Sequence, residues 1–192
     1  MGTTTTSSEI AVTTTATPSW RTGLVADPVR HRLPRIAAAV ECLAGPLPEV
    51  RIVITSRTAG AWLATEAEAG AVGGLPLATR IRAALSAQAS ARRAGAMATC
   101  VLAADHVLVV LFAPALLGGS EDTLIETLGH ELVHAAQLNR PGRRQARLED
   151  LRANHRLIDR PVADSYRAEA QICLEEAEAH ELEPAILAAV RA

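Results

Sequence analysis

The sequence predicts an α+β fold in which a small antiparallel or mixed sheet packs against two long helices. Runs of alternating and β-branched residues at 49–56, 98–103 and 106–112 predict strands. Apolar residues recur at helical spacing over 122–139 and again over 164–183, and these two segments are the predicted helices. The chain has 192 residues, of which 49% are hydrophobic, so we expect one domain with a substantial core.

The N-terminal segment 1–19 is rich in threonine and serine, and we expect it to be a disordered tail that precedes a single domain over 20–192. A basic start followed by an apolar core is missing from this segment, so a secretory signal is not expected. The first predicted helix then covers 29–43.

The middle of the chain alternates between helical and extended patterns. The segment 60–75 is rich in glycine and alanine and remains ambiguous, whereas 76–93 predicts a helix with a proline near its start. The elements predicted after it are two strands joined at Ala104-Asp105 and a further helix, at 98–103, 106–112 and 143–157. His106 is expected to be a turn residue rather than a ligand.

The helix predicted over 122–139 carries the sequence His130-Glu131-Leu132-Val133-His134. Ser120 is its predicted N-cap. Positions i and i+4 of a helix share one face, so the imidazoles of His130 and His134 can reach a single metal ion. Glu131 projects from the edge of that face, where a carboxylate can take a proton from a metal-bound water. Zinc hydrolases use this H-E-x-x-H arrangement.

Two histidines leave a tetrahedral site incomplete, so a third protein ligand is expected. One common class places a third histidine after a glycine, but the corresponding positions here hold Gln137 and Arg140. The remaining candidates are His155 and the acids of the last predicted helix, which are Glu175, Glu176, Glu178, Glu181 and Glu183. Most of these acids are expected to form a solvated helix face. Periodicity places Glu175 near the centre of the helix face that should meet the core. The apolar positions of that face are Ala168, Ile172, Ala179 and Leu182.

The segments LGHELVHAAQ and EEAEAHELE resemble the gluzincin metallopeptidases, especially their small single-domain members. The resemblance covers roughly residues 98–183 and implies a zincin-like fold. It implies Glu176 as the third metal ligand, ahead of Glu178 and then Glu175. It also implies that an edge strand borders the cleft and can pair with a peptide, and 106–112 is the best candidate for a strand of that sheet. The chain departs from the family at His180, where Asp or Asn is frequent, so the hydrogen-bond partner of the metal ligands is left open.

The expected function is zinc-dependent hydrolysis, most simply of a peptide bond in a peptide or protein substrate. Zinc held by His130, His134 and Glu176 would keep one position for water, and Glu131 would take the proton of that water. Tyr166 and His155 are candidate donors to the oxyanion. Two other readings stay open. One is a zinc-stabilised regulatory or binding module of the same fold without turnover, and the other is a helical interaction protein with an accidental motif.

The composition of the chain limits the classes of binding partner that we expect. The net charge of −2 predicts binding neither to nucleic acid nor to an anionic membrane. The longest apolar run, 107–117, contains Pro114 and is too short to span a bilayer. Three distant cysteines without C-x-x-C spacing indicate buried thiols and a reducing compartment, so a cytoplasmic location is expected. The sequence does not specify an oligomeric state.

Overall fold

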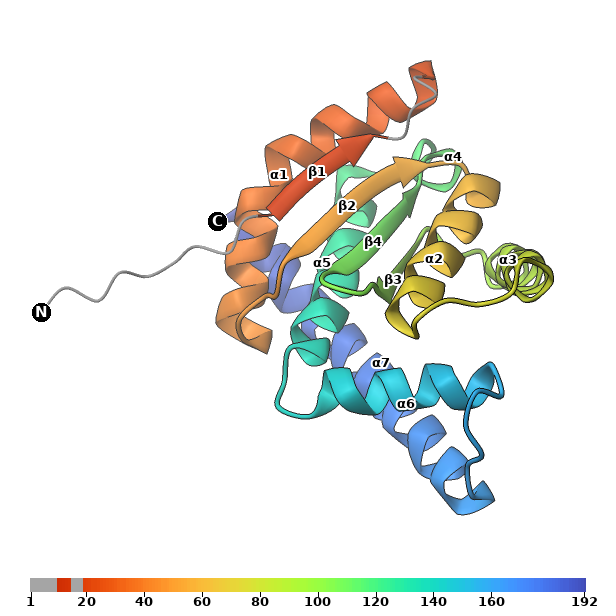
Figure 1. Ribbon diagram of the computed structural model, residues 1–192. Coiled ribbons are helices and arrows are strands. Elements are labelled where there is room, and N and C mark those ends of the chain that lie inside the picture. Colours follow the sequence, from red (N-terminus) through yellow and green to blue (C-terminus); the bar gives the residue numbers. More distant parts are fainter. Residues whose placement is uncertain (1–9, 15–18) are drawn as a thin grey trace, which may run out of the picture.

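The computed structural model describes residues 10–14 and 19–192. Helices dominate this part of the chain, and a small mixed sheet lies between them (Figure 1). The elements in chain order are β1 (Ile10–Thr14), α1 (Trp20–Ala44), β2 (Val50–Thr55), α2 (Arg57–Ala71), α3 (Leu77–Arg93), β3 (Ala98–Leu102), β4 (Val107–Phe112), α4 (Ala113–Leu116), α5 (Glu121–Leu138), α6 (Arg143–Asn154) and α7 (Val162–Arg191).

The strand order in the sheet is β1-β2-β4-β3. β2 runs parallel to β1 and β4, whereas β3 runs antiparallel to β4 with Cys100 opposite Val109. The two edge strands of the described sheet are β1 and β3, and β3 is the edge strand that contacts the motif helix α5. The segment 106–112, our candidate for a strand of the cleft, forms β4 in the sheet interior. Its side chains are buried along its whole length because helices cover both faces of the sheet at this interior strand.

Helices cover both faces of the sheet (Figure 1). The larger core joins β2 and β4 to α1, α5 and α7, and its fully buried members include Ile36, Ile52, Leu132 and Ile186. The smaller core lies on the other face, where Val110 and Phe112 meet α2 and α3. The long motif helix α5 is thus held between the sheet and the C-terminal helix α7.

The N-terminus differs from the prediction within 1–19. Residues 10–14 form β1, which pairs in parallel with β2 from Ile10 opposite Val50 to Thr14 opposite Ile54. The segment IAVTT is rich in β-branched residues, and the exposed edge of β2 supplies partners for its backbone. The remainder of the predicted tail lies outside the described residues.

The first helix is longer than the predicted segment 29–43, because it begins at Trp20 and continues through Pro28 and Pro34. Ser19 starts it with a capping box, in which Thr22 N donates to Ser19 Oγ at 3.2 Å. The ambiguous segment 60–75 is also mostly helical, as part of α2. In both helices a buried apolar face stabilises sequence that contains helix-disfavouring residues.

The C-terminal helix α7 is also longer than predicted, and only its second half joins the core. Ala179, Ile186 and Val190 are buried, whereas Ile172 is 38% exposed and Ala168 lies only partly buried. The predicted apolar stripe is therefore wrong for its first half. This half of α7 extends beside α6, away from the sheet that the described strands form (Figure 1).

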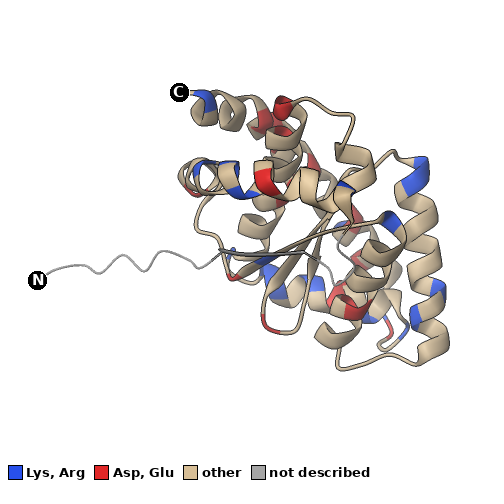
Figure 2. Ribbon diagram, turned by 90° about the horizontal axis from the view of Figure 1, so that it is seen from above, with Lys and Arg blue, Asp and Glu red and all other residues tan. Residues whose placement is uncertain are grey.

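Charged side chains of both signs are distributed over the helices, and the strands carry few of them (Figure 2). No helix among the described residues is long and apolar enough to cross a membrane. Cys42 and Cys173 are exposed and Cys100 is partly buried, so the expectation of buried thiols is wrong for the first two, which lie on solvent-facing sides of α1 and α7.

Candidate metal centre

The helix α5 presents both motif histidines to α7. Ser120 caps α5, with Thr123 N donating to Ser120 Oγ at 3.1 Å. Gly129 precedes the motif, and a Cβ atom at this position would lie 3.0 Å from Ile186 Cγ2. The absence of a side chain at residue 129 therefore allows α7 to lie close to α5 directly beside His130.

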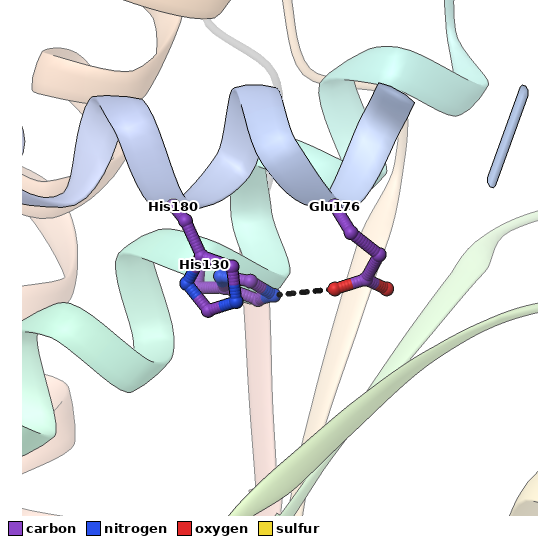
Figure 3. Close-up of side chains that lie close together, drawn as sticks. All are labelled: His130, Glu176 and His180. Atoms are coloured by element: carbon purple, nitrogen blue, oxygen red, sulfur yellow. Dashed lines mark ion pairs between the residues drawn. The ribbon is translucent and has the colours of Figure 1, made fainter. Parts of the chain in front are cut away.

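Glu176 of α7 faces both histidines. Its Oε2 lies 3.5 Å from His130 Nε2 (Figure 3). Its Oε1 lies 3.4 Å from His134 Nε2. The two Nε2 atoms are 3.0 Å apart. Ligands of a tetrahedral zinc ion with bonds of 2.0–2.2 Å lie roughly 3.3–3.5 Å from one another. The three groups therefore have the spacing of ligands around one such ion.

The two neighbouring acids point to other partners. Glu175 forms an ion pair with Arg143 at 2.6 Å. Glu178 pairs with Arg140, and this contact holds the pKa of Glu178 below its usual range. Of the three acids that the resemblance ranks, all of them described residues, Glu176 alone has its carboxylate beside both Nε2 atoms.

The outer nitrogen of each motif histidine has an oxygen acceptor. His130 Nδ1 donates to Glu183 Oε1 at 2.8 Å, and His134 Nδ1 donates to Gln137 Oε1 at 2.8 Å. Gln137 is in turn fixed by its Nε2, which donates to the Glu175 carbonyl at 2.9 Å. With Nδ1 as the donor in both rings, each Nε2 carries a lone pair that faces the other ring and Glu176. Three electron-rich groups thus face one another, and a cation would satisfy all of them.

Sequence reasoning missed Glu183 and Gln137. Glu183 lies about one turn beyond the family position held here by His180, and no local pattern separates it from the other acids of the helix. In the sequence, Gln137 excludes the class of zinc site that has a third histidine, but it does not reveal a hydrogen-bond partner of His134. The sign available in the sequence was its position three residues after His134, within hydrogen-bond reach on the same helix.

His180 is a further imidazole beside the candidate ligands. One potential metal-ligand atom from each of His130, Glu176 and His180 lies within 4.8 Å of the other two. The three side chains project into one space (Figure 3). Its Nδ1 donates to Glu183 Oε1 at 2.8 Å, the same oxygen that accepts from His130. Glu183 therefore positions two imidazoles at once.

Glu131 lies at the floor of the site and is 8% exposed. Burial, and secondly the charge of Glu176, raise the pKa of Glu131 to about 8. Burial also lowers the pKa of His134. A nearby cation would favour the carboxylate form of Glu131 and the neutral imidazole of His134.

A cleft of about 490 Å³ opens onto His130, Glu131, Glu176 and His180, whereas His134 lines a separate, smaller cavity. Glu131, His130 and Glu176 line one side of the cleft, and the segment 94–98, which leads into β3, lines the other. Tyr166 and His155, our candidate oxyanion donors, do not line this cleft. Tyr166 is exposed and lies ten residues before Glu176, about 15 Å along the helix. His155 follows α6 and lies near Glu68, whose pKa is raised by burial and only partly lowered again by the charges of Arg147 and His155.

The chain matches no protein-family model, and neither curated proteins nor solved structures are detectably similar to it. Any functional conclusion therefore depends on the geometry of the cluster and on the motif.

Proposed function

We propose that the protein is a zinc-dependent hydrolase, a peptidase of the gluzincin type, with His130, His134 and Glu176 as zinc ligands. The single observation that supports this best is the triangle of two Nε2 atoms and one carboxylate with sides of 3.0–3.5 Å. Imidazole and carboxylate are the ligands that catalytic zinc prefers, and three protein ligands leave one position free.

The chain's own residues would then divide the work. A bound zinc ion lowers the pKa of water and polarises a carbonyl oxygen. Glu131, beside His130 and at the floor of the cleft, accepts a proton from the attacking water and passes it to the leaving amine. Glu183 and Gln137 hold the two imidazoles with Nε2 toward the metal.

The substrate assignment depends on the sheet edge next to the cleft. The cleft wall 94–98 runs into β3, and among the described strands β3 has one sheet neighbour, β4. An extended peptide can pair with such an edge through its backbone. A peptide is therefore the substrate class that fits this arrangement.

A zinc-stabilised regulatory module is the second candidate, and His180 favours it. If its Nε2 joined the three ligands, the metal would have four protein donors and no position for water. The variant His180→Ala separates the two. A closed site loses zinc affinity without this side chain, whereas a site with three ligands keeps it.

The decisive experiment compares metal content with hydrolysis. Protein purified without a metal-affinity tag should contain about one zinc per chain and should cleave a mixed peptide library. Glu131→Gln should keep the zinc and lose hydrolysis, because Glu131 is not a ligand, whereas His134→Ala should lose both. If the protein takes up no zinc after reconstitution, the whole proposal is wrong. If Glu131→Gln hydrolyses peptides at the wild-type rate, Glu131 is not the base and the proposed mechanism is wrong.

A further inference from the structure

A second cavity, of about 380 Å³, adjoins the cleft of the metal centre. The two share Ala94, Ala96 and Ala98 in their walls, so they lie next to each other along the segment 94–98. The cavity lies along β3, with α2 and α3 on one side and Arg147 of α6 on the other.

The backbone of β3 offers hydrogen-bonding groups at this cavity. Phe112 N donates to the Met97 carbonyl at 2.8 Å, and Ala103 N donates to the His106 carbonyl at 3.0 Å. Hydrogen-bonded pairs alternate along an antiparallel ladder, so the backbone groups of Ala98 and Cys100 point away from β4. Both residues line the cavity. A peptide segment paired with them would place a side chain between α2 and α3.

The cavity walls fit an apolar side chain. Phe112 and Val101 line it from the sheet, and most of the surrounding helix positions are alanines, whose side chains end at Cβ and leave the space open. These alanines are Ala61, Ala64, Ala87, Ala91 and Ala94. Thr65 and Ser90 add two small hydroxyl side chains to the helix walls. The two charged residues of the wall, Glu68 and Arg147, lie 4.0 Å apart and offset each other.

We propose that this cavity is a specificity pocket that accepts a large apolar side chain, such as that of leucine, methionine or phenylalanine, from an extended peptide paired with β3. The identification of the peptide as a substrate rests on the proposed hydrolase function. The pocket itself rests on the sheet edge and on the alanine walls. It would select for one bulky uncharged residue near the bond that lies over Glu131.

Binding tests the pocket without requiring turnover. The probes are peptides acetyl-Ala-Ala-X-Ala-Ala-amide, with X as Gly, Leu, Phe, Glu or Arg, titrated into zinc-loaded Glu131→Gln and followed by backbone amide NMR shifts. We expect the Leu and Phe peptides to bind at least about tenfold more tightly than the Gly peptide, because the side chain leaves water. The shifts should centre on the amides of 98–101. Equal binding of all five peptides, absence of binding, or shifts confined to other elements would overturn the proposal.

A matched pair of variants tests the location. Ala87 and Ala78 are both exposed alanines of α3, and only Ala87 lines the cavity. Ala87→Phe should abolish the preference for Leu and Phe peptides, whereas Ala78→Phe should retain it. If both variants retain the preference, the side chain binds elsewhere. Hydrolysis of the same peptides by the wild type is measured in parallel. Cleavage with no preference at X would support the hydrolase and contradict the pocket. Selective binding without cleavage would support the pocket and contradict the hydrolase.

Discussion

Glu183 and His130 are joined by a hydrogen bond of 2.8 Å between Oε1 and Nδ1, across the interface of α7 and α5. This contact fixes the imidazole so that its other nitrogen faces Glu176. Glu183 lies on the same helix as the third candidate ligand, Glu176, and seven residues further along the chain. One rigid helix therefore sets both the metal-facing and the outward-facing contacts of His130.

The first prediction concerns this orienting contact. Glu183→Gln should lower zinc affinity about 10- to 100-fold without abolishing binding, because a neutral amide orients the ring less strongly. Glu181→Gln is the matched control, since Glu181 is an exposed acid on the same helix. Competition with a zinc-binding dye measures both. Equal affinities of the two variants would show that Glu183 does not support the site.

The second prediction concerns the third ligand. Glu176→Ala should lose its zinc under mild chelation, because it removes the carboxylate beside both Nε2 atoms. Glu175→Ala and Glu178→Ala should hold their zinc, because these acids pair with Arg143 and Arg140 instead. Elemental analysis after dialysis against a chelator checks all three. Loss of zinc from one of the last two, with Glu176→Ala intact, would reassign the ligand.

The third prediction is a pH dependence of the metal-free protein. The pKa of Glu131 rises from 4.5 to about 8 on folding, so the folded state holds a proton that the unfolded state releases. The resulting contribution is fully present below pH 4.5 and is lost as the pH rises toward 8. Between pH 6 and 8, wild type should therefore lose stability relative to Glu131→Gln, whose amide does not titrate. Urea unfolding of both proteins at the two pH values measures the difference, and a pH-independent difference would contradict the shift.

The fourth prediction concerns the spacing of the helices. A valine at position 129 would push against Ile186, because even its Cβ would lie 3.0 Å from Ile186 Cγ2. Gly129→Val should therefore cost about 1–3 kcal/mol of stability and weaken zinc binding. Gly129→Val combined with Ile186→Ala should recover part of the zinc affinity, because the added volume is then accommodated. Thermal unfolding and dye competition check the pair. Wild-type zinc affinity in the single variant would show that the helix spacing does not control the site.

The parts of the fold with strong local patterns could be predicted from the sequence. The helix with the motif, its cap at Ser120 and the hairpin of β3 and β4 follow from periodicity and turn position. The lengths of α1 and α7 could not be predicted in this way. Packing of their apolar side chains in the core allows α1 to continue past Pro28 and α7 past Pro184. Which strand lies at the edge also depends on pairing between distant segments, which local patterns do not contain.

The site shows the same division. His130 and His134 come from a spacing within one helix, so the sequence alone places them together. Glu176 needed the resemblance, because periodicity favoured Glu175. Glu183 and the arginines that engage the other acids depend on how α7 docks, and this docking is not encoded in the helix's own apolar pattern.

The two histidines stand on one helix and Glu176 on another, with 41 residues between His134 and Glu176 in the chain. An ion bound at this point would tie the end of the chain to its middle as a crosslink does, and the unfolded chain would offer it only the local pair. The protruding half of α7 and its neighbour α6 have few buried side chains of their own to anchor them. Loss of the ion would then favour local opening of this part of the fold before the sheet and its core open.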